Sequence, residues 1–219
     1  MILLARLSVS MGVTVFLSNI LAAKIWGFQL PILGWTFTFD AGLLLFPLSF
    51  LLGDMIIEIF GKRLANQVSW MTAIANIVAF GTLYLADLLP SIGIENGIDF
   101  QVIFGESLWV VIGSSVSFLL SRLLNNELFA RYRASGRGIF KWRALRSSFW
   151  GRLADTLIFN FIAFRGRLGD WELIRHMLCA FTIGMLLEWL LCELATSRMV
   201  RAIKHQYQLE EDAHISVGD

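Results

Sequence analysis

The chain has 219 residues, of which 57% are hydrophobic and only 16% are charged, and its mean hydropathy is +0.67. Soluble domains average about 25% charged residues, and disordered chains combine low hydrophobicity with high net charge, so both classes are excluded. The 18 basic residues are offset by 17 acidic ones, which argues against direct binding to nucleic acid. The composition predicts an all-α, polytopic membrane bundle of about six helices, because each span needs ~20 mostly apolar residues.

Charges and turn residues divide the chain into six apolar stretches. The first lies between Arg6 and Lys24 and is longer than the apolar part of a signal peptide, so we expect an uncleaved first helix. A Gly- and Pro-containing loop, residues 27–34, precedes the second span, and a strongly basic hydrophilic loop, residues 131–146, separates the fourth from the fifth. The predicted spans are residues 7–23, 37–60, 64–86, 107–124, 147–164 and 173–197.

Basic residues predict how the bundle is oriented, because cytoplasmic loops are enriched in Lys and Arg. The turn at Lys62 and Arg63, the loop 131–146 and the segment after residue 198 all fall on one side, whereas the loops near residues 34 and 94 contain no Lys or Arg. Both termini are therefore predicted to be cytoplasmic, although Arg165, Arg167 and Arg175 run against this bias. We expect one transmembrane bundle over residues 1–204 and a polar cytoplasmic tail over residues 205–219.

Charged side chains within the predicted spans are the candidates for function, because burying an ionisable group in a bilayer is costly. Asp54 and Glu58 lie one turn apart in the second span, and Arg152 and Asp155 are three residues apart in the fifth. Arg152 and Asp155 have a structural alternative, since they could neutralise each other. Glu188 is a further candidate, with Lys24 or Arg152 as its partner. Lys24 has the alternative of extending to the lipid headgroups. Asp40 and Glu193 lie near the ends of spans, where we expect them to be solvated.

Pro47 lies in the middle of the second predicted span. Proline cannot donate a backbone hydrogen bond and crowds the preceding turn, so we expect a helix break here, which either lines a transport cavity or is a plain kink. The chain lacks the phosphate-loop, zinc-protease and hydrolase-elbow motifs, and Gly53–Asp54 matches only half of the GxGD signature of intramembrane aspartyl proteases. No catalytic residue, cofactor or metal site is predicted.

Three motifs in register resemble those of one family, the queuosine-precursor transporters of the vitamin uptake transporter (VUT) group. They are SNILAAK at residues 18–24, the proline at 47 followed by D-x-x-x-E-x-[YF]-G at residues 54–61, and the run DTLIF at residues 155–159 that follows Trp142–Arg143. The resemblance covers nearly the whole chain. It implies a fold similar to the substrate-binding subunits of energy-coupling-factor vitamin transporters. It also implies uptake of 7-cyano-7-deazaguanine, 7-aminomethyl-7-deazaguanine or queuine across the bacterial inner membrane, to supply tRNA modification.

A guanine-like ligand of this kind indicates which residue types would bind it. A carboxylate accepts the adjacent N–H and NH₂ donors of the base edge, amide and cationic groups donate to its acceptors, and an aromatic ring stacks on its face. We expect Asp155 or Glu58 to read the base edge and Asp54 to pair with Lys24. The candidate substrate-binding residues are Asn19, Lys24, Asp54, Glu58, Arg152, Asp155, Phe159, Asn160 and Phe164.

Three functional classes stay open at this level. The first is a transporter that works alone in the lipid bilayer, by facilitated diffusion or with a coupling proton carried by a buried carboxylate. The second is a substrate-capture subunit that needs an energy-coupling module with an ATPase. The third is an intramembrane enzyme, which the missing motifs disfavour. The sequence does not determine the preferred precursor or the oligomeric state.

Overall fold

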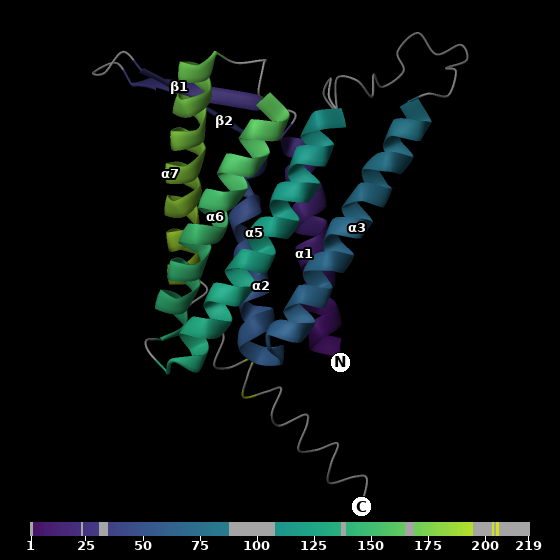
Figure 1. Cartoon of the computed structure of the whole chain (residues 1–219), viewed down its shortest axis with the longest axis vertical. Helices are drawn as coiled ribbons and strands as arrows, with labels where there is room; N and C mark the ends of the chain where they lie inside the picture. The colour runs from purple at the N-terminus through teal and green to yellow at the C-terminus, as the bar shows by residue number, and fades with distance from the viewer. Residues whose placement is uncertain are drawn as a thin grey trace, which may run out of the picture.

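The protein is a helical bundle with a short β-hairpin at one end (Figure 1). The computed structural model describes residues 2–22, 24–30, 35–87, 108–136, 139–164, 169–194, 203 and 205. Six α-helices lie in these ranges, which confirms the prediction of a helical bundle. The elements in chain order are α1 (Ile2–Leu21), β1 (Ile25–Leu30), β2 (Trp35–Asp40), the 3₁₀ helix η1 (Ala41–Leu44), α2 (Phe46–Phe60), α3 (Lys62–Asp87), α5 (Leu108–Ala134), α6 (Phe140–Phe164) and α7 (Asp170–Leu194).

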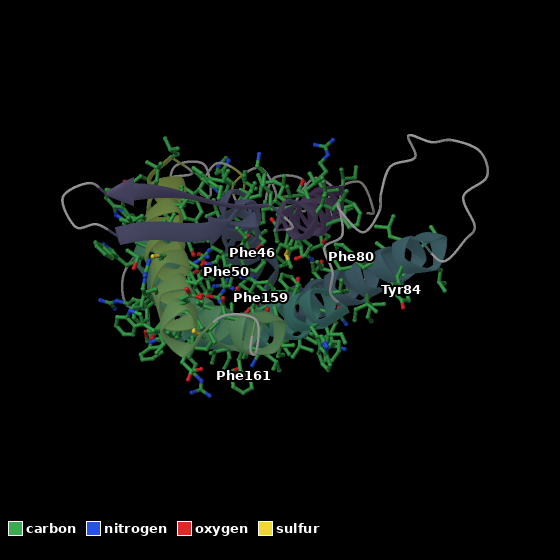
Figure 2. The ribbon with its side chains drawn as sticks, turned by 90° about the horizontal axis from the view of Figure 1, so that it is seen from above. Phe46, Phe50, Phe80, Tyr84, Phe159 and Phe161 are labelled. Atoms are coloured by element: carbon green, nitrogen blue, oxygen red, sulfur yellow. The ribbon has the colours of Figure 1, made fainter. Side chains whose placement is uncertain are left out.

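Helix α2 is the centre of the bundle. It packs against α1, α3, α5, α6 and α7, and ten of its fifteen residues are buried. Helices α3, α5, α6 and α7 contact one another in that order and form an arc when seen from above, with α1 and α2 on its inner side (Figure 2). Side chains on α2 are therefore surrounded by the other helices.

The bundle is apolar on its outer faces and buries many polar and charged side chains beside its apolar core, which is unusual for a soluble domain. Large hydrophobic side chains at helical spacing are exposed on the outer faces, for example Trp70, Ile74 and Ile77 on α3, whereas Arg122 and Arg152 are among the largest fully buried side chains. Among the described helices, α1, α3 and α7 are long and apolar enough to cross a membrane by length and composition. This arrangement gives the protein an outer surface suited to lipid.

The second predicted span is wrong in its first nine residues. Residues 37–40 belong to β2, which pairs antiparallel with β1 from Ile25↔Asp40 to Leu30↔Trp35, and residues 41–44 form η1. The alternation W-T-F-T-F is typical of a strand, because successive side chains point to opposite faces. Pro47 lies in the first turn of α2, where its missing N–H costs no helical hydrogen bond, so the expected break inside a helix is also wrong.

The basic loop predicted at residues 131–146 is mostly helical. Helix α5 continues to Ala134, and α6 begins at Phe140 after a turn in which Gly136 adopts a φ of +65°. Glu127 explains part of this extension, because its carboxylate pairs with Arg131 one turn later at 2.7 Å and with Lys62 of α3 at 2.8 Å. The predicted tail lies outside the described residues except for residue 205, so the domain boundary stays a prediction.

Candidate functional site

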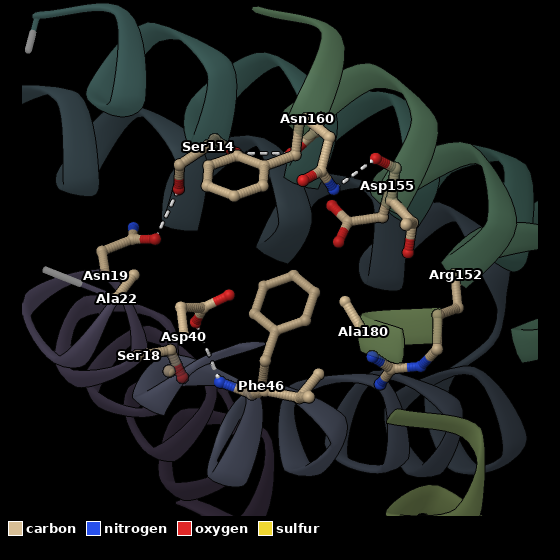
Figure 3. Close-up of a pocket in the computed structure, with 15 residues that line it drawn as sticks. Ser18, Asn19, Ala22, Asp40, Phe46, Ser114, Arg152, Asp155, Asn160 and Ala180 are labelled. Carbon is tan, nitrogen blue, oxygen red and sulfur yellow. Dashed lines mark hydrogen bonds between the residues drawn. The ribbon is translucent and has the colours of Figure 1, made fainter. Parts of the chain in front are cut away.

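A cavity lies between the hairpin end of the bundle and its middle (Figure 3). About 530 Å³ of space between its walls is free of protein atoms, open solvent included. Its walls come from α1, the β2–η1 junction, α2, α5, α6 and α7. The polar residues that line it are Ser18, Asn19, Asp40, Ser114, Ser117, Arg152, Asp155, Thr156 and Asn160, and the apolar ones include Phe46, Phe159 and Ala180.

Close helix packing brings these walls together. On α5, a methyl group added at Gly113 would meet Ile162 of α6 at 3.3 Å, and on α6 one added at Gly151 would meet the Phe50 ring at 2.9 Å. Small residues at helix contacts let backbones approach closely in lipid. As a result, the polar face of α6 from Arg152 to Asn160 lies across the cavity from α1 and η1.

Helix α6 supplies polar atoms that the protein itself does not satisfy. Arg152 donates from Nε to Glu188 at 3.3 Å, and Asn160 donates from Nδ2 to the Thr156 carbonyl at 2.8 Å. Within the described structure, Arg152 Nη2, Asp155 Oδ1 and Asn160 Oδ1 are buried and have no hydrogen-bond partner. Buried polar atoms are nearly always paired with protein, water or ligand, so this wall offers one donor and two acceptors to a ligand.

The opposite wall is more fully satisfied. Asn19 of α1 donates to Asn76 of α3 at 3.2 Å and accepts a short hydrogen bond from the Ser114 hydroxyl of α5. Asp40 accepts from the Leu43 N–H at 3.1 Å and so caps η1. Asn19 lines the cavity, and its amide ties three helices together; its binding of a substrate stays a prediction.

Two phenylalanines give the cavity flat apolar surfaces. Phe46 and Phe159 both line it, and they point toward the middle of the bundle in Figure 2, whereas Phe161 lies on the outer face. The Phe46 ring is fixed by an edge contact with Phe50, with ring centroids 5.7 Å apart, and the Arg152 guanidinium lies 5.9 Å from its centroid. A planar ligand could stack on such a ring.

Asp54 does not reach the cavity, and its predicted pairing with Lys24 is wrong. Asn125 donates to its Oδ1 at 2.6 Å, Ser148 to its Oδ2 at 3.4 Å, and Arg122 Nη1 lies 4.0 Å away. Lys24 is exposed beyond the end of α1. The Asp54 carboxylate therefore belongs to a buried polar network that links α2, α5 and α6.

Glu58 is also placed away from the cavity, toward the end of the bundle opposite the hairpin. It pairs with Arg143 at 2.9 Å and with Arg133 at 3.9 Å. Of the two acids predicted to read a base edge, only Asp155 lines the cavity. Of the two partners considered for Glu188, Arg152 is the one that pairs with it, at 3.3 Å, and Arg152 also interacts electrostatically with Asp155. The Phe164 side chain lies outside the described residues.

Several residues of the site and its surroundings escaped prediction. Asp40 was expected to be solvated but lines the cavity, because residues 37–40 form a strand and not a helix. Arg122, Asn125 and Asn126 are fully buried, and their spacing of three and four residues within an apolar stretch was an available signal of one polar helix face. Phe46 was not predicted, because nothing in the sequence distinguishes it from the other phenylalanines among the 18 in the chain.

Comparison with known proteins places the chain in a family. Residues 40–201 match the family model described as "Putative vitamin uptake transporter". The chain belongs to this family. It is 31% identical over 140 residues to the queuosine precursor transporter of Escherichia coli (strain K12), a match that covers 62% of this chain and 60% of that relative. No solved structure matches. The protein is therefore a helical membrane protein of a transporter family and not of an enzyme family.

Proposed function

We propose that this protein takes up 7-deazaguanine precursors of queuosine across the bacterial inner membrane. The observation that carries the proposal is the set of free polar atoms on α6, because it complements the edge of a guanine-like base. Asp155 Oδ1 would accept from the ring N–H and amino group, and Arg152 Nη2 would donate to the neighbouring carbonyl oxygen. The name of the Escherichia coli relative supports the same ligand class.

The walls of the cavity support a flat ligand. Phe46 and Phe159 offer ring faces, and stacking of a base on an aromatic side chain contributes about 1–3 kcal/mol. Asn160 Oδ1 is a further acceptor for a ring N–H group. The expected ligands are 7-cyano-7-deazaguanine, 7-aminomethyl-7-deazaguanine and queuine, with no direct contact to nucleic acid.

Charge distribution supports an outward position of the cavity. Lys62, Arg63, Arg131, Arg133 and Lys141 all lie toward the end of the bundle opposite the hairpin (Figure 1). If this end faces the cytoplasm, as the positive-inside bias requires, both termini are cytoplasmic and the hairpin faces outward. The cavity then lies in the outer half, where an importer receives its substrate.

The second candidate is a substrate-capture subunit that releases its ligand only with an energy-coupling ATPase. Uptake by the purified chain in proteoliposomes would separate the two, because a capture subunit binds the base but does not move it across the bilayer. A pH gradient of either sign, applied in the same vesicles, tests a coupling proton.

The deciding experiment is genetic. Bacteria that lack both precursor synthesis and their own importer are given this chain and one precursor at a time, and queuosine in tRNA is measured. We expect rescue by at least one precursor, loss of rescue with Asp155→Asn, and normal rescue with the matched variant Asp170→Asn, whose side chain is exposed on α7. No rescue by any precursor, with the protein present in the membrane, would contradict the proposed substrate.

A further inference from the structure

The charged groups of the cavity do not balance. Among the described residues, those with charged side chains that line it are Asp40, Asp155 and Arg152. The charge of Arg152 is already offset by Glu188, whose carboxylate lies 3.3 Å away in the core. Arg152 also interacts electrostatically with Asp155, which leaves Asp40, among the described lining residues, as the carboxylate with no cation beside it.

The two carboxylates occupy different sides of the Phe46 ring. In Figure 3, Asp40 lies on one side of the ring, and Asp155 and Arg152 lie on the other. A flat base over this ring can present its pairing edge to only one of the two carboxylates. The other carboxylate faces a different part of the ligand.

Asp155 is the better reader of the base edge. A guanine-like edge carries N–H donors beside a carbonyl oxygen, so it needs an acceptor beside a donor. Asp155 and Arg152 meet this need, because they lie on one face of α6 and each has a buried, unsatisfied atom among the described contacts. Asp40 stands alone and has no neighbouring guanidinium in Figure 3.

We infer that Asp40 is a cation site, which selects precursors carrying a protonated amine on carbon 7 of the deazaguanine ring. The inference rests on the proposed function and specifies which of its ligands Asp40 selects. The aminomethyl base and queuine carry a protonated amine, whereas the nitrile base is neutral. Asp40 lies where the hairpin joins η1, at the end of the bundle (Figure 1).

The local structure fits this role. One carboxylate oxygen of Asp40 accepts the Leu43 N–H, and the backbone N–H groups of Asp40 and Gly42 also act on the carboxylate, which fixes the side chain at the wall of the cavity. An N⁺–H···O⁻ hydrogen bond is roughly twice as strong as a neutral one, so the same site discriminates between charged and uncharged side groups. Asparagine at this position can keep the cap but not the charge.

The test compares two ligands in two proteins. Full-length protein in nanodiscs is titrated with the aminomethyl base and with the nitrile base, before and after Asp40→Asn. We expect the wild type to bind the aminomethyl base about tenfold or more tightly than the nitrile base, and Asp40→Asn to remove most of this preference. Asp170→Asn, the same change at an exposed position, should leave it intact.

A measurement on the wild-type protein alone tests the inference even if Asp40→Asn does not fold. The 7-hydroxymethyl base is neutral and close to the aminomethyl base in size, so it should compete about tenfold more weakly than the amine. Equal binding of charged and neutral bases, or an unchanged preference in Asp40→Asn, would overturn the inference and leave the proposed function standing. Failure to bind any of these bases would instead refute the proposed function.

Discussion

Gly184 of α7 leaves room for the Arg152 side chain. Replacing Gly184 by alanine should therefore displace Arg152 from the wall of the cavity and impair uptake. A Cβ at this position would lie 2.5 Å from Arg152 Nη1, 3.0 Å from its Cζ and 3.1 Å from Leu43 Cδ1. Real Cβ atoms do not approach other heavy atoms to 2.5 Å, so the guanidinium has to move.

The surroundings of Arg152 make this movement costly. Its side chain is 2% exposed, and its guanidinium lies 5.2 Å from the Phe50 ring centroid and 5.9 Å from that of Phe46. Inserting a methyl group into a packed core costs about 1–3 kcal/mol, and separating Arg152 from Glu188 would add to this, because an unpaired buried charge is strongly destabilising. The helix-propensity gain of alanine over glycine, about 1 kcal/mol, offsets only part of it.

The assay is thermal unfolding of purified protein in detergent together with precursor uptake by cells. We expect Gly184→Ala to lower the unfolding temperature and to reduce uptake at least tenfold. Gly12→Ala on α1 is the matched control, because a Cβ there meets nothing within 4 Å in the described structure, and it should leave both readouts unchanged or slightly raise stability. If Gly184→Ala unfolds at the temperature of Gly12→Ala and transports normally, the packing argument for Arg152 is refuted.

Three further predictions test the buried network around Asp54, the stacking of a base on Phe46 and the cation site at Asp40. Asp54→Asn removes one of the two carboxylates that act on the buried Arg122 guanidinium, so we expect a loss of stability that is smaller than the ~3–5 kcal/mol of a buried charge left with no partner. Adding Arg122→Gln should restore part of this loss in thermal unfolding, and no recovery would contradict the pairing. Phe46→Ala should weaken base binding by about 1–3 kcal/mol, whereas Phe161→Ala, on the outer face, should not change the binding constant. Burial raises the pKa of Asp40, in the hairpin and outside the helices, to about 6. Because a cation binds the ionised form, affinity for the aminomethyl base should fall below a pH of about 6, and a titration of Asp40→Asn should lack this fall.

The sequence by itself determined the class of fold. Stretches of about 20 apolar residues have few alternatives to membrane-spanning helices, because a bilayer leaves no water to satisfy an exposed backbone. The same reasoning singled out Arg152, Asp155 and Glu188, since charge within such a stretch is conspicuous wherever the helices pack. The motifs shared with the queuosine-precursor transporters identified the family.

Only the tertiary structure decided which of these charges belong to the site. Residues 37–40 were assigned to a helical span, and their pairing with the strand at residues 25–30 places residue 40 at the wall of the cavity instead. The partners of Asp54 and Glu58 are on α5 and α6, far along the chain, and were fixed by how each helix is rotated about its axis. That rotation depends on packing between helices, at contacts such as Gly113 against Ile162 and Gly184 against Arg152, and hydropathy along a single helix carries no record of it.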